Sequence, residues 1–168
     1  VNENKINELY TKMSYTRQQP VKPVTLTDSL YIKEWLNTSW QKLLYQEEHQ
    51  VYTSANGEQV RSKSEVIIAD TLKRMNIPYR YEYSLELKDG RTLYPDFLCL
   101  NVHSRKEYYW EHFGMMDDQE YLERTIQKLK LYSENKIFPG KNLIITMESQ
   151  AYPLNVKQIE NLVKEFLQ

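Results

Sequence analysis

Two short stretches decide the fold: YPDF at residues 94–97 and YYWEHFG at residues 108–114. Each reads as the end of a β-strand, and each places one acid, Asp96 or Glu111, among aromatic and aliphatic neighbours. Side chains alternate between the two faces of a strand, so each acid shares a face that is otherwise apolar. A carboxylate on a buried face is costly unless its charge is compensated, and a metal ion can supply that compensation. The two acids therefore indicate a metal site near the ends of two strands.

The segments around these stretches predict an α/β domain with the element order α-β-β-β-α-β-α. Hydrophobic spacing changes along the chain between the helical period and the alternation of strands, and Asp89-Gly90 is a strong hairpin turn. Asp117 and Glu120 have the spacing of a capping box, which predicts the start of a helix. The strands are expected to form a mixed four-stranded sheet flanked by helices. The predicted elements are a helix over 64–76, strands over 79–87, 91–100 and 106–113, a helix from about 117 to 135, a strand over 141–147 and a helix over 155–167.

The N-terminal region, residues 1–50, is expected to be a separate extension of the domain at 51–168. It begins with a polar linker, and Thr27 or Asp28 is placed to cap an amphipathic helix that runs to about Gln46. The apolar stripe of that helix either packs on the following domain or docks a larger protein or partner chain.

Composition limits the class of protein. The chain has 168 residues and a formal net charge of −1, which argues against a protein that binds nucleic acid through its overall charge. Cys99 is the single cysteine and has no partner for a disulfide, which fits a reducing cytoplasm. No apolar run is long enough to span a membrane, so no membrane partner is expected. The chain begins at Val1 without a recognisable signal peptide, which suggests a fragment or a processed chain.

Three acids on separate elements are the candidate metal ligands. Glu65 heads the apolar face of the helix at 64–76 and would lie near Asp96 and Glu111 if that helix crosses the sheet. Hard cations such as Mg²⁺ or Mn²⁺ take carboxylate oxygens together with substrate phosphate and water. A metal held in this way polarises a phosphoryl oxygen, activates water and stabilises the leaving oxygen. For each acid alone, pairing with an arginine or lysine is the simpler explanation, but the three together favour a metal site.

The order of these elements and motifs resembles the PD-(D/E)XK nuclease superfamily. The resemblance covers about residues 60–147 and rests on a helical Glu, Pro-Asp in the second hairpin strand and Glu in the third strand. The segments RSKSE at 61–65, YPDF at 94–97 and WEHFG at 110–114 are similar to a bacterial and phage branch of that superfamily. The resemblance implies a restriction-endonuclease-like αβββαβ core. It also implies that Asp96 and Glu111 bind metal, and that Glu65 does so directly or through water.

One position departs from that pattern. The superfamily carries a lysine two residues after the strand Glu, where this chain has Phe113. Either the site is inactive or another element supplies the lysine. On the following helix, Lys130 lies on a solvent-facing stripe, whereas Lys128 lies beside the apolar row that faces the sheet. We therefore predict Lys128 as a relocated catalytic lysine, with Tyr132 one turn further on. The competing explanation is a lysine that extends past a core tyrosine to solvent.

Four further residues are candidate substrate contacts. Arg61 and Lys63 lie at a helix N-terminus, where the helix dipole also favours anions. Tyr132 is placed to hold Lys128 or a phosphate. His112 points to the strand face opposite Glu111 and is expected either to contact substrate or to be a hydrogen-bonded structural histidine, but not to bind metal.

The sequence as a whole predicts a hydrolase that cleaves nucleic-acid phosphodiester bonds with Mg²⁺ or Mn²⁺. DNA is favoured over RNA only because of the resemblance. Phe113 supports the alternative of an inactive nuclease fold that binds nucleic acid. A second alternative is an interaction domain of a larger protein, docked through residues 28–46.

Overall fold

The computed structural model describes residues 3–20, 25–40 and 51–168, in two compact units that comprise residues 1–39 and 40–168. The sequence places the boundary at 50/51, next to residues 41–50, which lie outside the described residues, so that boundary stays a prediction. The described part of the first unit has helices α1 (Glu3–Thr11), α2 (Tyr15–Gln18) and α3 (Asp28–Leu36).

Helix α3 begins where the sequence predicts and ends earlier. The Thr27 hydroxyl accepts a hydrogen bond from the amide of Leu30 at 3.3 Å, so Thr27 is the cap. The helix ends at Leu36 instead of continuing to Gln46, with Asn37 as its C-terminal cap and residues 38–40 outside any helix. The last part of the predicted helix, residues 41–46, lies outside the described residues. A partner for this helix stays a prediction.

The second unit is an α/β domain built on a mixed four-stranded sheet. Its strands follow the spatial order β3-β6-β7-β8, with β3, β6 and β7 antiparallel and β7 parallel to β8. Parallel neighbours need a crossover connection, and helix α5 (Gln119–Glu134) supplies it between β7 and β8. The strands are β3 (Tyr79–Tyr81), β6 (Phe97–Asn101), β7 (Lys106–Phe113) and β8 (Leu143–Met147).

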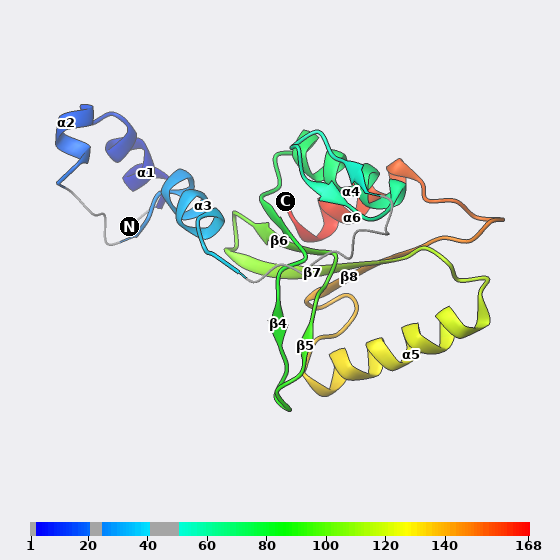
Figure 1. Ribbon diagram of the computed structural model, residues 1–168. Helices are drawn as coiled ribbons and strands as arrows, with labels where there is room; N and C mark the ends of the chain where they lie inside the picture. The colour runs from blue at the N-terminus through cyan, green and yellow to red at the C-terminus, as the bar shows by residue number, and fades with distance from the viewer. Residues whose placement is uncertain (1–2, 21–24, 41–50) are drawn as a thin grey trace. The chain divides into compact units, whose positions relative to one another are not determined.

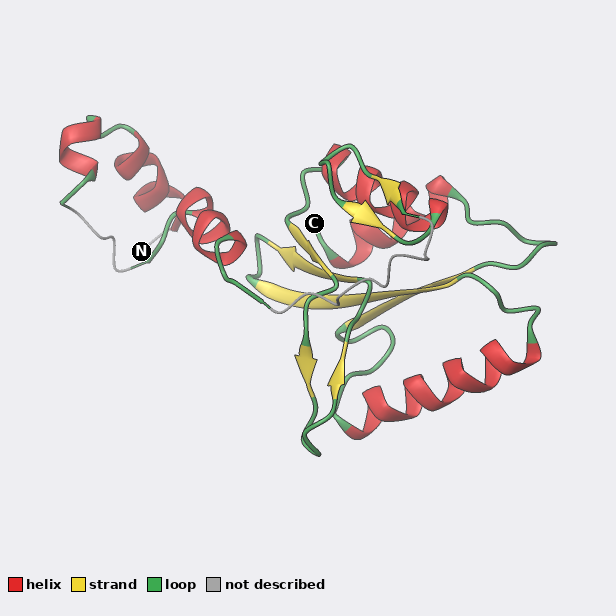
Figure 2. Ribbon diagram, in the orientation of Figure 1, coloured by secondary structure: helices red, strands yellow, loops and turns green. Residues whose placement is uncertain are grey.

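Helices cover both faces of the sheet (Figures 1 and 2). Helices α4 (Lys63–Arg74) and α6 (Val156–Phe166) lie together on one face, and α5 (Gln119–Glu134) lies on the other. The larger core, under α4 and α6, includes Ile68, Leu72 and the fully buried Trp110. A smaller core includes Tyr132 of α5 and Leu143 of β8. The observed order α4-β3-β6-β7-α5-β8-α6 matches the predicted α-β-β-β-α-β-α.

The predicted hairpin over 79–100 is present, but it bends in the middle. Each of its two long strands is split, so that β4 (Leu85–Glu86) pairs with β5 (Thr92–Leu93) in a ribbon that leaves the main sheet (Figure 1). Glu82 has a φ of +48°, a left-handed conformation that ends β3. The Glu82 amide still donates to the Asp96 carbonyl at 3.0 Å, so the two arms stay paired across the bend.

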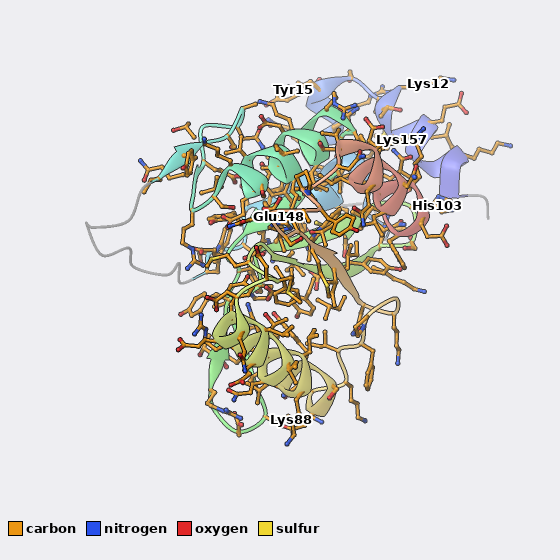
Figure 3. All side chains as sticks on the ribbon, turned by 90° about the vertical axis from the view of Figure 1, so that its right-hand side faces the viewer. Lys12, Tyr15, Lys88, His103, Glu148 and Lys157 are labelled. Atoms are coloured by element: carbon orange, nitrogen blue, oxygen red, sulfur yellow. The ribbon has the colours of Figure 1, made fainter. Side chains whose placement is uncertain are left out.

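The tip of this hairpin reaches the C-terminal end of α5. Asp89-Gly90 forms the predicted turn, and Gly90 adopts a φ of +84° that favours glycine. The Lys88 amide donates to Asn135 Oδ1 at 3.0 Å, and Figure 3 shows Lys88 near one end of α5. The ribbon and the helix are thus joined at one end.

Short-range signals set the remaining elements. A second small ribbon pairs β1 (Tyr52–Thr53) with β2 (Gln59–Val60). Asp118, and not the predicted Asp117, caps α5 by accepting the Tyr121 amide at 2.7 Å.

Cys99 is buried in β6 as a free thiol. Within the described residues, the helices are too short or too polar to cross a membrane.

Candidate functional site

A cavity of about 280 Å³ lies where the end of β7 and the start of β6 meet α5 and the start of α4. It contains the motif residues that the sequence singles out on three separate elements. Its lining residues are Arg61, Glu65, Asp96, Glu111, His112, Phe113, Tyr121, Arg124, Thr125 and Lys128.

Glu111 is held in place by two residues of α5. Its carboxylate is almost fully buried, with 1% of the residue exposed. The ammonium of Lys128 lies 2.7 Å from Oε1 and 2.8 Å from Oε2. Tyr132, one turn further along the helix, donates its hydroxyl to Oε1. Lys128 and Tyr132 share a helix face because residues four apart lie on the same side. The ammonium of Lys128 thus lies beside the carboxylate of Glu111. Position 113, two residues further along the strand, holds Phe113 and supplies no lysine there.

Asp96 is held by the protein backbone. It follows Pro95 and precedes β6, so that its carboxylate faces the end of β7. The main-chain amide of His112 donates to Oδ2 at 2.7 Å. Among the described residues, no donor reaches Oδ1. One oxygen is therefore fixed, and the other is available to a ligand in the cavity.

The charges at this site are incompletely balanced. Burial raises the pKa of Asp96 well above its ordinary value, and the neighbouring Glu111 charge raises it further against the opposing effect of Lys128. Burial also raises the pKa of Glu111, although Lys128 and Tyr132 act in the opposite direction. For Lys128, burial disfavours the charged form, but the carboxylates of Glu111 and Asp96 outweigh it and raise the pKa. One ammonium therefore faces two carboxylates, and a further cation would stabilise the ionised pair.

Glu65 is placed differently from the other two acids. Its Oε2 accepts the Arg61 amide at 2.9 Å and the Tyr81 hydroxyl at 2.6 Å, and its Oε1 accepts the Ser62 hydroxyl at 3.0 Å. Ser62 in turn accepts the Glu65 amide, so the pair caps the N-terminus of α4. In the part of the chain that the structure describes, no three His, Cys, Asp or Glu residues gather as a metal-binding group. Glu65 lines the same cavity as Asp96 and Glu111, but these donors already occupy its carboxylate, so metal binding by Glu65, directly or through water, stays a prediction.

The two basic residues predicted at this end of α4 differ in their position. Arg61 lines the cavity and forms an ion pair with the buried Glu82. Burial disfavours its charged form, but Glu82, Tyr81 and Glu65 together outweigh that effect and raise the pKa of Arg61. Lys63 is exposed at the first residue of α4 and is not part of the cavity lining. A phosphate contact from the side chain of Arg61 thus fits the cavity better than one from Lys63.

The side chain of His112 forms a buried network on the α4 side of the sheet. Nδ1 lies 3.0 Å from Thr146 Oγ1, and Nε2 lies 3.1 Å from Glu148 Oε1. Glu148 also accepts the hydroxyl of Ser64 at 2.5 Å, and Figure 3 shows it between α4 and α5. His112 borders the cavity, but a substrate contact by its ring would replace one of these hydrogen bonds. The network matches the structural alternative that the sequence leaves open.

Sequence reasoning missed two residues of the cavity wall as functional candidates. Tyr121 and Arg124 lie on the same side of α5 as Lys128, at helical spacing. The signal was present, because Tyr121 shares the helical stripe of Thr125, Lys128 and Tyr132. Arg124 lies at the edge of that stripe and has the polarity of an ordinary surface residue.

The two central acids are expected to cost the metal-free protein stability by different amounts. Asp96 has a raised pKa in the folded state, so it lowers stability as pH rises from the ordinary Asp pKa through the folded value. Asp96→Asn removes this cost, and the free energy of unfolding in EDTA at neutral pH should rise by about 1 kcal/mol or more, since a tenfold change in proton affinity is worth about 1.4 kcal/mol. The pKa of Glu111 is also raised, but Glu111→Gln takes the counter-charge from Lys128, so its gain in stability should be smaller than that of Asp96→Asn. Urea unfolding measures both, and a larger gain for Glu111→Gln would contradict this account.

The chain is similar to parts of two much longer proteins. No model of a known protein family matches the chain. Over 93 residues, or 54% of this chain, the sequence is 39% identical to the uncharacterized protein MJ1519 of Methanocaldococcus jannaschii, and the match covers 8% of that protein. A cryo-EM structure of a DrdV–DNA complex has a TM-score of 0.37 and 16% identity, over 62% of this chain and 11% of that chain. Each match thus covers only a small part of the other protein's own length.

Proposed function

We propose that residues 51–168 form a metal-dependent nuclease domain with a restriction-endonuclease-like core, and that it hydrolyses phosphodiester bonds of DNA. The observation that supports this most strongly is the contact between Lys128 and Glu111 beside Asp96 in one cavity. Phe113 argues against an active site, because it stands where a lysine is expected. The ammonium of Lys128 supports activity, because it supplies a positive charge beside Glu111 from another element. The choice of DNA rests on the resemblance of the three sequence motifs.

Asp96 and Glu111 are the residues that would hold the metal. Two carboxylates, with substrate phosphate and water in the other positions, are a usual ligand set for Mg²⁺. Oδ1 of Asp96 lacks a donor among the described residues, and burial together with the Glu111 charge raises the pKa of Asp96, so a bound cation would stabilise its ionised form. The donor set therefore fits Mg²⁺ or Mn²⁺. When bound, such an ion would polarise the scissile phosphate and neutralise negative charge that develops on it.

The side chains around the acids have separate tasks in this proposal. Lys128 keeps its charge because Glu111 and Asp96 stabilise it, and it is placed to orient water or to stabilise developing charge on the phosphoryl oxygens. Tyr132 fixes the orientation of the Glu111 carboxylate. The His112 amide fixes Asp96. Glu65 and Tyr81 hold the start of α4, and with it Arg61, at the rim of the cavity.

One observation favours a second function. Glu111 is already contacted by Lys128 on both oxygens and by Tyr132 on one, so the ion pair is closed without a metal. A domain of this kind could bind nucleic acid through Arg61 and Arg124 and cleave nothing. This alternative predicts binding that is independent of divalent ions.

The two functions are distinguished by incubating the purified chain with end-labelled single-stranded DNA, duplex DNA and RNA. The incubations contain Mg²⁺, Mn²⁺ or EDTA, and products are separated on denaturing gels. We expect cleavage of DNA in Mg²⁺ or Mn²⁺ and none in EDTA. We also expect either ion to raise the melting temperature of the protein but not that of Asp96→Asn. Binding without cleavage under every divalent ion would establish the second function in place of the first.

A further inference from the structure

Helix α5 presents more than one functional residue to the cavity. Tyr121, Arg124, Thr125 and Lys128 all line it, at the spacing of three and four residues that places side chains on one side of a helix. Lys128 contacts Glu111 and belongs to the site of the proposed reaction. Arg124 lies about one turn earlier and Tyr121 about two turns earlier, and the proposed reaction leaves them without a role.

Arg124 is weakly held, in contrast with the other two cations of the cavity wall. Its side chain is 64% exposed, and its ion-pair partner among the described residues is Glu120, at 3.8 Å and 89% exposed. Exposed pairs of this kind contribute little to stability. Lys128 and Arg61, by comparison, pair with the buried acids Glu111 and Glu82. Arg124 is therefore the lining cation that can pair with an anionic ligand without breaking a buried ion pair.

Tyr121 supplies a second polar group beside Arg124. The guanidinium carbon of Arg124 lies 5.8 Å from the centre of the Tyr121 ring, within the range of a cation–π contact. The Tyr121 oxygen accepts the Gly114 amide at 3.2 Å. No described residue accepts a hydrogen bond from the Tyr121 hydroxyl. Burial raises the pKa of Tyr121, which keeps that hydroxyl protonated and able to donate.

We propose that Arg124 and Tyr121 form a subsite for a phosphate next to the scissile one on the DNA strand. The subsite rests on the proposed function, because the position of the scissile phosphate is taken from Asp96, Glu111 and Lys128. Four residues of an α-helix span about 6 Å, so Arg124 lies roughly one nucleotide step from Lys128. Its planar guanidinium can donate two parallel hydrogen bonds to the non-bridging oxygens, and the Tyr121 hydroxyl can donate one more.

The test uses the whole chain and a short fluorescent single-stranded DNA, in EDTA and in Mg²⁺. Arg124→Gln should weaken binding about tenfold, because a hydrogen bond to a charged group is worth about 1.5 kcal/mol at the lower end of its range. The salt dependence of the affinity should fall by about 0.7 in the log–log slope, as expected for the loss of one phosphate contact on a single strand. Arg124→Lys should recover the slope but only part of the affinity. Tyr121→Phe should weaken binding by a smaller factor.

Lys130→Gln is the matched control, since Lys130 is an exposed cation on the opposite side of α5. The proposal is overturned if Arg124→Gln and Lys130→Gln bind DNA with equal affinity and equal salt slope, or if the unmodified chain binds no DNA. In cleavage assays, Arg124→Gln should raise KM more than it lowers kcat. A chain that binds DNA through Arg124 and cleaves nothing would support the subsite and refute the nuclease. If the unmodified chain cleaves DNA and Arg124→Gln binds and cleaves it equally well, the nuclease is supported and the subsite is refuted.

Discussion

Asp96→Asn and Glu111→Gln are each expected to reduce DNA cleavage by at least about a thousandfold in Mg²⁺. Each change replaces a charged ligand with a neutral amide of nearly the same shape. A divalent ion contributes several kcal/mol of transition-state stabilisation, and each 1.4 kcal/mol is a factor of ten in rate. Single-turnover cleavage of a labelled duplex measures the loss.

Glu107→Gln is the control for this pair, because Glu107 is an exposed acid on the same strand, β7. It should cleave at the rate of the unmodified chain. The higher stability predicted for Asp96→Asn makes misfolding a poor explanation if that variant loses activity. Normal cleavage by either variant would remove that acid from the site.

Lys128→Ala is expected to lower the cleavage rate by about a hundred- to a thousandfold, the usual cost of one well-placed electrostatic group. DNA affinity should change little, because the Lys128 ammonium is occupied by Glu111 in the free protein. Lys130→Ala, which removes an exposed charge from the same helix, should change neither quantity. Rates at saturating DNA and affinities measured in EDTA separate the two effects.

The outcome for Lys128 decides whether this lysine acts in the reaction or only in the structure. Equal rates for Lys128→Ala and Lys130→Ala would mean that the lysine serves only to neutralise Glu111. Lys128→Arg adds a finer comparison, because it keeps the charge but changes its shape. Partial activity in Lys128→Arg, with none in Lys128→Ala, would indicate that the charge matters more than the geometry of the ammonium.

Local patterns in the sequence predicted much of the fold. The alternation of 106–113 gives the bounds of β7, and the helical spacing after Ser62 gives α4 to within two residues. Both patterns are short-range, so neighbouring residues determine them. The bend at Glu82 was missed, because its left-handed backbone and its ion pair with Arg61 depend on tertiary structure.

The candidate site shows the same division. Helical periodicity was sufficient to distinguish Lys128 from Lys130, and the structure brings Lys128 to Glu111. Periodicity could not show that the oxygens of Glu65 are occupied by donors that include Tyr81, which is distant in the sequence. Periodicity also could not distinguish Arg124 from any other exposed arginine. The position of Arg124 at the cavity depends on where β7 and α5 meet.

The backbone contact to Asp96 has a consequence for how this protein tolerates mutation. Every amino acid except proline carries the amide that Asp96 accepts from position 112, so a change of side chain there leaves that donor in the chain. A change at position 112 would therefore cost the hydrogen bonds of the His112 ring to Thr146 and Glu148, but not the amide that holds Asp96. The acid on one face and the packing on the other can change independently, which makes position 112 a place where the interior can be redesigned while the anchor of Asp96 is retained.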